Sequence, residues 1–380
     1  MLFYILLIAL LQGSILAANT KKGADLYSRP SGSVANPFPT VIQEKYTGNG
    51  INFLVIGDWG QKGPGTGQLQ VAAAMKTWAD SNKTTFIINV GDSFYRTSNS
   101  NTTALDPNDH EGVLNETDPK WNTYWLDVYN GTLSEITWYT VAGNHDWYAN
   151  VTAEVDYFWD INSRFFIPAL YYVRQVTFSN NVIATFIHID TDPFYYNYST
   201  YTKNDDMKSN ELNLNLYTTN QTDVILQWLE QQLINAQGSD WIFVVGHHPL
   251  VGDCALYNPS QYYLMYEFPP LLIKYKVSAY FNGHAHELAI SVANNTSPVT
   301  YFGSGAGGAT LGSGCANPTW TNGLSFGFLS INIPDKGDTL YYEFVDSNTT
   351  DTPPTIVYSG KINSRLLEMI LSALVKKLSG

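Results

Sequence analysis

Residues 51–60 read INFLVIGDWG, an apolar run that ends abruptly in glycine, aspartate and tryptophan. A run of β-prone residues is typical of a buried strand, and the Gly-Asp pair after it indicates a loop. Five later segments repeat this pattern of an apolar run ending in polar residues: TTFIINVGDSFY (84–95), TWYTVAGNHDWY (137–148), VIATFIHIDTDPF (182–194), WIFVVGHHPL (241–250) and VSAYFNGHAHE (277–287). The sequence therefore predicts a set of buried strands that run into polar loops.

Two segments between these runs, 68–79 and 224–236, carry apolar residues at helical spacing, and Asp223 is placed to cap the second. Strands that alternate with helices predict an α/β domain. In such sheets, ligands bind outside the carboxyl ends of the strands, which is where the polar clusters fall. The sheet is therefore expected to position the functional residues.

The composition narrows the class of protein. The chain has 380 residues, of which 44% are apolar and 14% are charged, and its net charge is −13. This composition excludes a disordered protein, a coiled coil and a collagen-like fibre. It argues against a nucleic-acid partner, because there is no basic excess to bind phosphate groups. A negatively charged substrate would need local positive charge, such as a metal ion.

Residues 1–18 are predicted to be a secretory signal peptide. Residues 2–12 form an apolar run, LFYILLIALLQ, and small residues lead to a cleavage site near Ala17 or Ala18. An N-terminal membrane anchor is the alternative, but the run is too short to span a bilayer. The expected location is the secretory pathway, with a final destination outside the cell or in a lysosome or vacuole.

Two further features agree with secretion. Ten Asn-X-Ser/Thr sequons are candidate glycosylation sites, at Asn82, Asn101, Asn115, Asn130, Asn150, Asn197, Asn220, Asn294, Asn295 and Asn348. The chain has only two cysteines, Cys254 and Cys315, which could form one disulfide in an oxidising compartment or remain a free pair. The sequence therefore predicts a secreted glycoprotein.

One domain, residues 51–346, is predicted between two flanking segments. Residues 19–50 lack apolar periodicity and are expected to be an N-terminal extension. In the C-terminal tail, 347–380, residues 365–378 place apolar side chains at helical spacing. This amphipathic helix is expected to pack on the body or on another subunit. The alternative is a helix that lies at a membrane surface.

Five polar clusters carry side chains that can bind metal ions, and each follows a predicted strand: Asp58 in GDWG, Asp92 and Tyr95 in GDSFY, Asn144 and His145 in GNHD, His247 and His248 in GHHP, and His284 and His286 in GHAH. One such residue alone is usually a turn residue, a helix cap or a structural histidine. Five of the seven histidines, however, lie in these clusters. This concentration indicates a metal site.

The set is larger than one ion needs. Imidazole, carboxylate, amide and phenolate groups suit harder or borderline metals rather than copper(I) or an iron–sulfur cluster. Two metals about 3.5–4 Å apart are a known arrangement for displacement at phosphorus, where they bind phosphate oxygens and lower the pKa of a bound water. A bridging carboxylate would let the clusters serve both ions. The residues therefore favour a binuclear phosphoesterase.

These five motifs, in this order, resemble the sequence blocks of the calcineurin-like metallophosphoesterases. GDWG and the spacing of Asp92 and Tyr95 are similar to those of the purple acid phosphatases, and the single-domain size is similar to the small, tartrate-resistant type. The resemblance covers residues 51–346. It implies an α/β (α+β) fold, the four-layer αββα sandwich of two mixed β-sheets flanked by helices, and the hydrolysis of phosphate monoesters.

The resemblance also implies two sets of metal ligands. The first set is Asp58, Asp92, Tyr95 and His286, and the second is Asp92, Asn144, His247 and His284. Three anionic oxygens suit Fe(III), whereas mostly neutral ligands suit a divalent ion. The resemblance implies Fe(III) with Fe(II), Zn(II) or Mn(II), and a purple colour from tyrosinate bound to iron.

Two histidines are predicted to be catalytic. His145 is placed to contact the substrate phosphate or to protonate the leaving alkoxide; Asp146 either orients its imidazole or is a turn carboxylate. The small acid phosphatases carry a second active-site histidine after the ligand that matches His247, and this chain has none at that spacing. His248 is the predicted substitute, and the alternative is that His145 acts alone.

The leading prediction is an acid phosphatase that hydrolyses small phosphomonoesters with a metal-activated hydroxide. A phosphodiesterase or nucleotidase on the same scaffold is a second interpretation, and a non-catalytic, phosphatase-like anchoring protein is a third. Two polar insertions, 96–120 and 191–222, are expected to face the substrate. His110, in the first insertion, is expected to be solvated, and His188 is expected to be structural. The oligomeric state is open.

Overall fold

The computed structural model describes residues 21–101, 106–107, 109–179, 181–195, 216, 221–251, 262–292, 298–312, 318–348, 353–365 and 367–368. The predicted signal peptide, most of the second insertion, both cysteines and most of the predicted C-terminal helix lie outside these residues. All of the predicted metal ligands lie within them.

The run INFLVI forms most of strand β2 (Gly50–Ile56), in the middle of a seven-stranded sheet that we call sheet B. On one side of it, β3, β4 and β5 follow in parallel pairings. On the other side, β13, β14 and β15 are each antiparallel to the strand before them in the sheet. The strand order is β15 (Thr355–Asn363), β14 (Thr339–Asp346), β13 (Gly327–Pro334), β2, β3 (Phe86–Asn89), β4 (Trp138–Thr140) and β5 (Phe165–Phe166). The sheet therefore includes β15, which lies beyond the predicted domain end at 346.

A second sheet, sheet A, has eight strands in the order β1 (Ile42–Tyr46), β6 (Tyr172–Phe178), β7 (Val182–His188), β8 (Trp241–Val245), β9 (Ala279–Asn282), β11 (Thr300–Ser304), β10 (Leu288–Ser291) and β12 (Trp320–Asn322). Strands β7, β8, β9 and β11 are parallel to one another. His188, at the end of β7, is buried and stacks on the Tyr172 ring at 4.4 Å, in agreement with the structural role expected for it.

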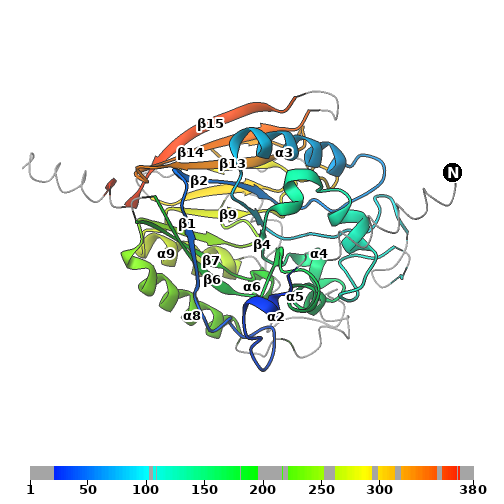
Figure 1. Cartoon of the computed structure of the whole chain (residues 1–380), viewed down its shortest axis with the longest axis horizontal. Helices are drawn as coiled ribbons and strands as arrows, with labels where there is room; N and C mark the ends of the chain where they lie inside the picture. Colours follow the sequence, from blue (N-terminus) through cyan, green and yellow to red (C-terminus); the bar gives the residue numbers. More distant parts are fainter. Residues whose placement is uncertain are drawn as a thin grey trace, which may run out of the picture.

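Helices cover the outer faces of the two sheets and complete four layers (Figure 1). Helix α3 (Gln68–Asn82) packs on sheet B, where Trp78 Nε1 donates to Ser330 Oγ at 2.9 Å. Helices α8 (Gln221–Asn235) and α9 (Tyr262–Lys274) lie against sheet A (Figure 1). The predicted αββα sandwich of two mixed sheets is confirmed.

The two predicted helices are present with shifted ends. Helix α3 continues to Asn82, and α8 begins at Gln221, so Asp223 lies in its first turn and is not its cap. The other described helices are short: α2 (Gly23–Leu26), the π-helix η1 (Trp121–Leu126), the 3₁₀ helices η2 (Gly131–Glu135) and η4 (Ala236–Gly238), α4 (Asn144–Trp147), α5 (Val151–Asp160) and α6 (Asp192–Tyr195).

Aromatic side chains join the two sheets. Phe53 of β2 stacks on Phe86 of β3 with ring centroids 4.8 Å apart. It also meets Phe186, Phe243 and Phe281 of sheet A in edge-on contacts at 5.7–6.3 Å. All five rings are fully buried. Ring pairs of this geometry add to the stabilisation from burial, so these contacts hold the sheets face to face and bring their strand ends together.

The segment before the predicted domain also contributes to the fold. Strand β1 pairs in parallel with β6 at the edge of sheet A, and it supplies Glu44. Glu44 Oε2 accepts hydrogen bonds from Nε and Nη2 of Arg174 at 2.9 and 2.6 Å. The Arg174 side chain is fully buried, and its guanidinium lies 3.2 Å from the Tyr139 ring centroid. A buried cation needs its partner, so β1 contributes to the stability of the fold.

The substitution Glu44→Gln is expected to lower the free energy of unfolding by about 3 kcal/mol, because Arg174 would remain buried without its counter-charge. Urea denaturation at neutral pH measures the change. The matched control is Lys45→Gln, on the exposed side of the same strand, which is expected to change stability by less than about 0.5 kcal/mol. Equal effects of the two substitutions would contradict the importance of the ion pair.

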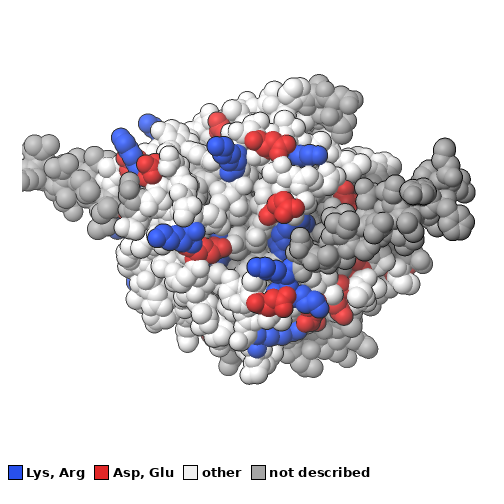
Figure 2. Space-filling view, viewed as in Figure 1, with Lys and Arg blue, Asp and Glu red and all other residues white. Residues whose placement is uncertain are grey.

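The surface carries charges of both signs. On the face in Figure 2, basic and acidic side chains are interspersed, and much of the surface is uncharged. Among the described helices, none has the length and apolar character needed to cross a membrane. The predicted amphipathic helix at 365–378 lies mostly outside the described residues.

Candidate metal centre

The predicted metal ligands gather where strands of both sheets end. The loops after β2, β3 and β4 of sheet B and after β8 and β9 of sheet A supply seven side chains: Asp58, Asp92, Tyr95, Asn144, His247, His284 and His286. Strands β2, β3 and β4 are parallel, and so are β8 and β9. Parallel strands present their carboxyl ends at one edge of a sheet, and packing of the two sheets brings both edges together.

Three of the predicted ligands have a backbone conformation that L-residues rarely adopt. The φ angle is +56° at Asp58, +53° at Asp92 and +66° at His284. Such residues are strained by about 1–3 kcal/mol and cluster at functional sites. The glycines of the motifs leave room for the ligands, since a Cβ on Gly91 would lie 2.9 Å from His247 Nδ1. The tight packing explains why glycine precedes Asp92 in GDSFY.

The first predicted ligand set converges on the hydroxyl of Tyr95. This oxygen lies 3.1 Å from Asp58 Oδ1, 2.8 Å from Asp92 Oδ2 and 3.1 Å from His286 Nε2. His286 Nε2 is also 3.4 Å from Asp58 Oδ1. Four donor atoms from three loops therefore surround one point.

The second set adjoins the first through the same carboxylate oxygen. His247 Nε2 lies 3.2 Å from Asp92 Oδ2 and 3.2 Å from Asn144 Oδ1. His284 Nδ1 is 2.9 Å from Asn144 Oδ1. Asp92 Oδ2 is thus common to both sets, which is the position that a bridging ligand needs.

These spacings fit metal coordination. Bonds of about 2.1 Å set neighbouring ligand atoms about 3.0 Å apart in an octahedron and about 3.4 Å apart in a tetrahedron. The spacings above span 2.8–3.4 Å. The first set has three oxygens and one imidazole, which suit a harder ion. The second set has two imidazoles, an amide and the shared carboxylate, which suit a borderline divalent ion. The residues present therefore fit a binuclear centre.

Backbone carbonyls orient two of the imidazoles. His247 Nδ1 lies 2.8 Å from the carbonyl oxygen of Val90, and His286 Nδ1 lies 2.7 Å from that of Thr310. A carbonyl accepts only, so each Nδ1 carries the proton and each Nε2 keeps its lone pair for a metal. This arrangement is typical of histidine ligands.

Electrostatics also favour bound cations. Burial and the charges of Asp58 and Asp92 hold the pKa of the Tyr95 hydroxyl well above its usual value. Burial and the neighbouring His247 lower the pKa of His284 to about 3, so its imidazole is neutral. Although burial opposes it, the Asp92 charge raises the pKa of His247 to about 9. Protons or metal ions must balance the carboxylates here, and metal ions would also ionise Tyr95.

The predicted catalytic His145 lies beside the ligands, and a residue that we did not predict orients it. His145 Nδ1 is 2.9 Å from Glu111 Oε2. The sequence suggests Asp146 as the residue that orients His145. Asp146 instead accepts hydrogen bonds from the backbone N–H groups of Asp92, Ser93 and Gly143 at 2.9 Å. Asp146 therefore holds the loops in place and does not orient the imidazole.

Asp146 has a buried acidic neighbour, Glu154 on α5, and both are almost completely excluded from solvent. Burial and the charge of Asp146 raise the pKa of Glu154 well above its usual value. Burial and the charge of Asp92 raise the pKa of Asp146 to about 6. Two like charges at close range disfavour each other, so Glu154 holds its proton in the folded state.

The stability of the protein is therefore expected to depend on pH through Glu154. A raised folded-state pKa means that the stabilisation is complete below the unfolded pKa of about 4.3 and is lost as pH rises toward the folded value. The loss should be about 1 kcal/mol per pH unit. Glu154→Gln, which is uncharged at every pH, should remove this slope. Urea denaturation of both proteins between pH 5 and 8 tests this, and parallel stability curves would contradict it.

His248, the predicted second catalytic histidine, is fully buried. Thr191 Oγ1 lies within hydrogen-bonding distance of the backbone N–H of His247 (3.3 Å), the backbone N–H of His248 (3.1 Å) and His248 Nδ1 (2.8 Å). Two N–H donors use both lone pairs of the hydroxyl, so its proton is donated to Nδ1 and the ring proton lies on Nε2. Although the ring nitrogens of His247, His248 and His284 cluster within 4.8 Å, a protonated Nε2 is no ligand. His248 therefore lies buried beside the predicted ligands, and its catalytic role stays a prediction.

The expectation that His110 is solvated was wrong. Its side chain is buried, and Nε2 lies 3.2 Å from Asp118 Oδ2. The first insertion folds back against the site, because Lys120 Nζ donates to the carbonyl oxygens of Tyr95 and Gly112 at 2.9 and 3.1 Å. The described part of this insertion is therefore packed structure.

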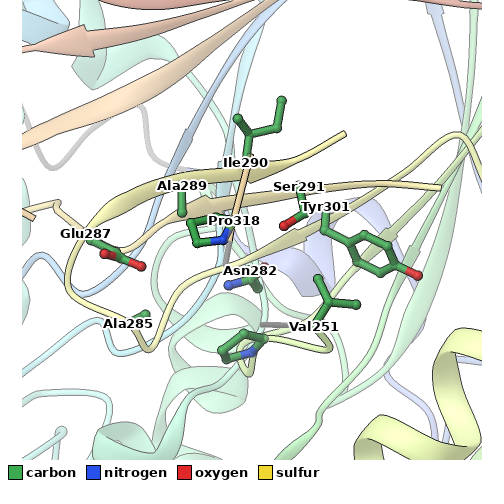
Figure 3. Close-up of a pocket in the computed structure, with 11 residues that line it drawn as sticks. Val251, Asn282, Ala285, Glu287, Ala289, Ile290, Ser291, Tyr301 and Pro318 are labelled. Atoms are coloured by element: carbon green, nitrogen blue, oxygen red, sulfur yellow. The ribbon is translucent and has the colours of Figure 1, made fainter. Parts of the chain in front are cut away.

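A pocket lies next to the loop that carries His284 and His286 (Figure 3). Its lining is mostly apolar, with Asn282 and Glu287 among the few polar groups. Ala285, between the two histidine ligands, faces it from the loop, and Tyr301 faces it from β11 (Figure 3). Apolar surface is therefore available close to the predicted metal ligands.

A family model described as calcineurin-like phosphoesterase matches residues 51–288, more than half of the chain. Purple acid phosphatase 7 of Arabidopsis thaliana is 28% identical over 316 residues, which are 80% of this chain and 85% of that protein. Tartrate-resistant acid phosphatase type 5 of Rattus norvegicus is 30% identical over 266 residues, 68% of this chain and 72% of that protein.

Two solved structures share the fold. The structure of GAP50, the anchor in the inner membrane complex of Plasmodium, aligns with a TM-score of 0.63 and 22% identity, over 84% of this chain and 90% of its own. A dimetal phosphatase from Danio rerio aligns with a TM-score of 0.51 and 12% identity, over 83% of this chain and 99% of its own. At these identities the likeness concerns the fold.

Proposed function

Because the chain belongs to the calcineurin-like phosphoesterase family, in its purple acid phosphatase branch, we propose that it hydrolyses phosphate monoesters at acidic pH with a binuclear metal centre. The observation that carries the proposal is the position of the Tyr95 hydroxyl, 2.8–3.1 Å from Asp58, Asp92 and His286. A phenol at this point suits a tyrosinate ligand to Fe(III). The second set, with one carboxylate and neutral ligands, suits Fe(II), Zn(II) or Mn(II).

The two bound ions would supply hydroxide and neutralise charge that develops on the phosphoryl oxygens. The protein's own groups perform the other tasks. Asp92 would hold both ions at a fixed separation, and Asn144, His247 and His284 would fix the second ion. His145, whose side chain is 25% exposed, would contact the substrate phosphate or donate a proton to the leaving alkoxide.

The proposed location is the secretory pathway, with a final site outside the cell or in a lysosome or vacuole. Support comes from the predicted signal peptide and the ten sequons, and from the acid phosphatase names of the relatives. The substrate proposed is a small phosphomonoester, and the alcohol it carries is open.

A non-catalytic anchoring role is the alternative function, because the structural neighbour GAP50 is described as an anchor. Loss of ligands would be its signature in the sequence. All seven predicted ligands are present, and their donor atoms lie at coordination spacing. The intact site favours catalysis.

The first experiment is metal analysis, a visible absorption spectrum and a phosphatase assay on one purified sample. We expect about two metal ions per chain, one of them iron, a visible tyrosinate-to-iron charge-transfer band, and hydrolysis of phosphomonoesters at acidic pH. Tyr95→Phe should abolish the band while the second metal remains bound, because it removes only the phenolate. The control is Tyr148→Phe, which removes a hydroxyl that bonds to Asn144 but is not a predicted ligand.

A colourless protein with two divalent ions would contradict the Fe(III)–tyrosinate part of the proposal and favour another kind of metallophosphoesterase. A protein that binds no metal after reconstitution with iron and zinc would contradict the proposal and favour the anchoring role.

A further inference from the structure

We propose that Glu111, supplied by the polar insertion after β3, is a positioning residue for His145, and that Arg96 and Lys120 hold Glu111 in place. The inference rests on the proposed phosphatase function, since it concerns how His145 meets the substrate. It assigns a task to an insertion whose sequence pointed only to a polar loop.

The backbone and one face of His145 are fixed by metal-site residues. Its backbone N–H donates to Asp92 Oδ1 at 2.7 Å. Its ring lies against the Tyr95 ring with centroids 4.1 Å apart and meets the Tyr148 ring at 4.9 Å. These contacts restrict the ring to the edge of the metal cluster. They do not determine which nitrogen faces the substrate.

Glu111 determines which nitrogen of His145 faces the substrate. Its Oε2 lies 2.9 Å from His145 Nδ1, and an ionised carboxylate only accepts hydrogen bonds. Nδ1 therefore carries a proton, and Nε2 is the nitrogen left for the substrate. An imidazole with a fixed orientation can keep a proton within hydrogen-bonding reach of the leaving oxygen or bind a phosphate oxygen.

Glu111 is itself held on both oxygens. Arg96 Nε lies 3.0 Å from Oε1, and the Arg96 backbone N–H donates to Oε2 at 3.1 Å. The Glu111 side chain is only 7% exposed. The carboxylate therefore has one orientation, and Oε2 accepts hydrogen bonds from both His145 Nδ1 and the Arg96 backbone N–H.

The insertion is fastened where it carries Glu111. The buried Lys120 Nζ donates to the carbonyl oxygens of Tyr95, His110 and Gly112. Gly112 has φ +55°, and a Cβ there would lie 3.0 Å from the carbonyl oxygen of His145. The loop thus packs directly on the helix that carries His145. A loop packed in this way keeps the Glu111 carboxylate, and with it the imidazole, in one orientation.

The test uses full-length, metal-loaded protein and the substitution Glu111→Gln. An amide has one acceptor oxygen where the carboxylate has two. If that oxygen faces His145, the NH₂ group faces Arg96 Nε, and if it faces Arg96 Nε, the NH₂ group faces His145 Nδ1. We expect kcat for an alkyl phosphate to fall about 10- to 100-fold, with a smaller fall for an aryl phosphate, whose leaving group needs less protonation. Metal content and the visible spectrum should not change.

Two further variants separate positioning from a structural effect. Asp109→Asn removes another carboxylate of the same insertion, one that accepts a hydrogen bond from the Thr97 backbone at 2.8 Å and has no described contact with His145; it should leave kcat within about twofold. In the His145→Ala background, Glu111→Gln should have no additional effect, because the residue acts through His145. An equal loss in both backgrounds, loss of bound metal, or no loss of kcat would overturn the proposal.

A measurement that does not depend on turnover tests the positioning by Glu111 independently of the proposed function. In zinc-loaded protein with ¹⁵N-labelled histidine, His145 should be seen as the Nδ1–H form and should lose that preference in Glu111→Gln, with His145→Ala identifying the signal. If the wild type lacks phosphatase activity but shows this behaviour, the function fails and the positioning by Glu111 stands. An unchanged His145 signal in Glu111→Gln would overturn the positioning.

Discussion

The site depends on the placement of one carboxylate, that of Asp92. Its Oδ2 lies 2.8 Å from the Tyr95 hydroxyl and 3.2 Å from His247 Nε2, so it joins the two ligand sets. Its Oδ1 accepts the His145 backbone N–H, and its own N–H is bound by the Asp146 carboxylate. The backbone at Asp92 has φ +53°, a conformation that persists only when its surroundings impose it. The same bonds that impose this strain also place His145.

This placement is built on the packing of two sheets. The aromatic contacts around Phe53 fix the face-to-face distance, and the parallel strands on each side deliver their loops to one edge. One sheet supplies mainly carboxylates, the phenol and the amide, and the other supplies the imidazoles. A change in sheet packing would therefore separate the oxygen ligands from the imidazoles. The packing of the core is therefore required for the side chains of the site to converge.

The convergence of the seven candidate ligands could be predicted, because each follows a strand end that the sequence pattern identifies. The partner of His145 could not be predicted in this way. Glu111 is 34 positions away, and it is one of five acidic residues in 96–120. The environment of His248 could not be predicted either, because adjacency to His247 says nothing about burial or the bond to Thr191. Strand β1 was missed because its alternation spans only five residues.

The insertion supplies the group that orients the His145 imidazole. Asp146, next to His145 in the sequence, accepts three backbone N–H groups, and these bonds brace the loops that carry Asp92 and Asn144. A carboxylate used in this way has no oxygen in position for the imidazole, so the orienting acid must come from elsewhere. The loop between β3 and η1 supplies it, and Lys120, at the end of that loop, ties it to the backbone of Tyr95. The bracing of the metal loops and the orientation of His145 are thus separate tasks, and each has its own carboxylate.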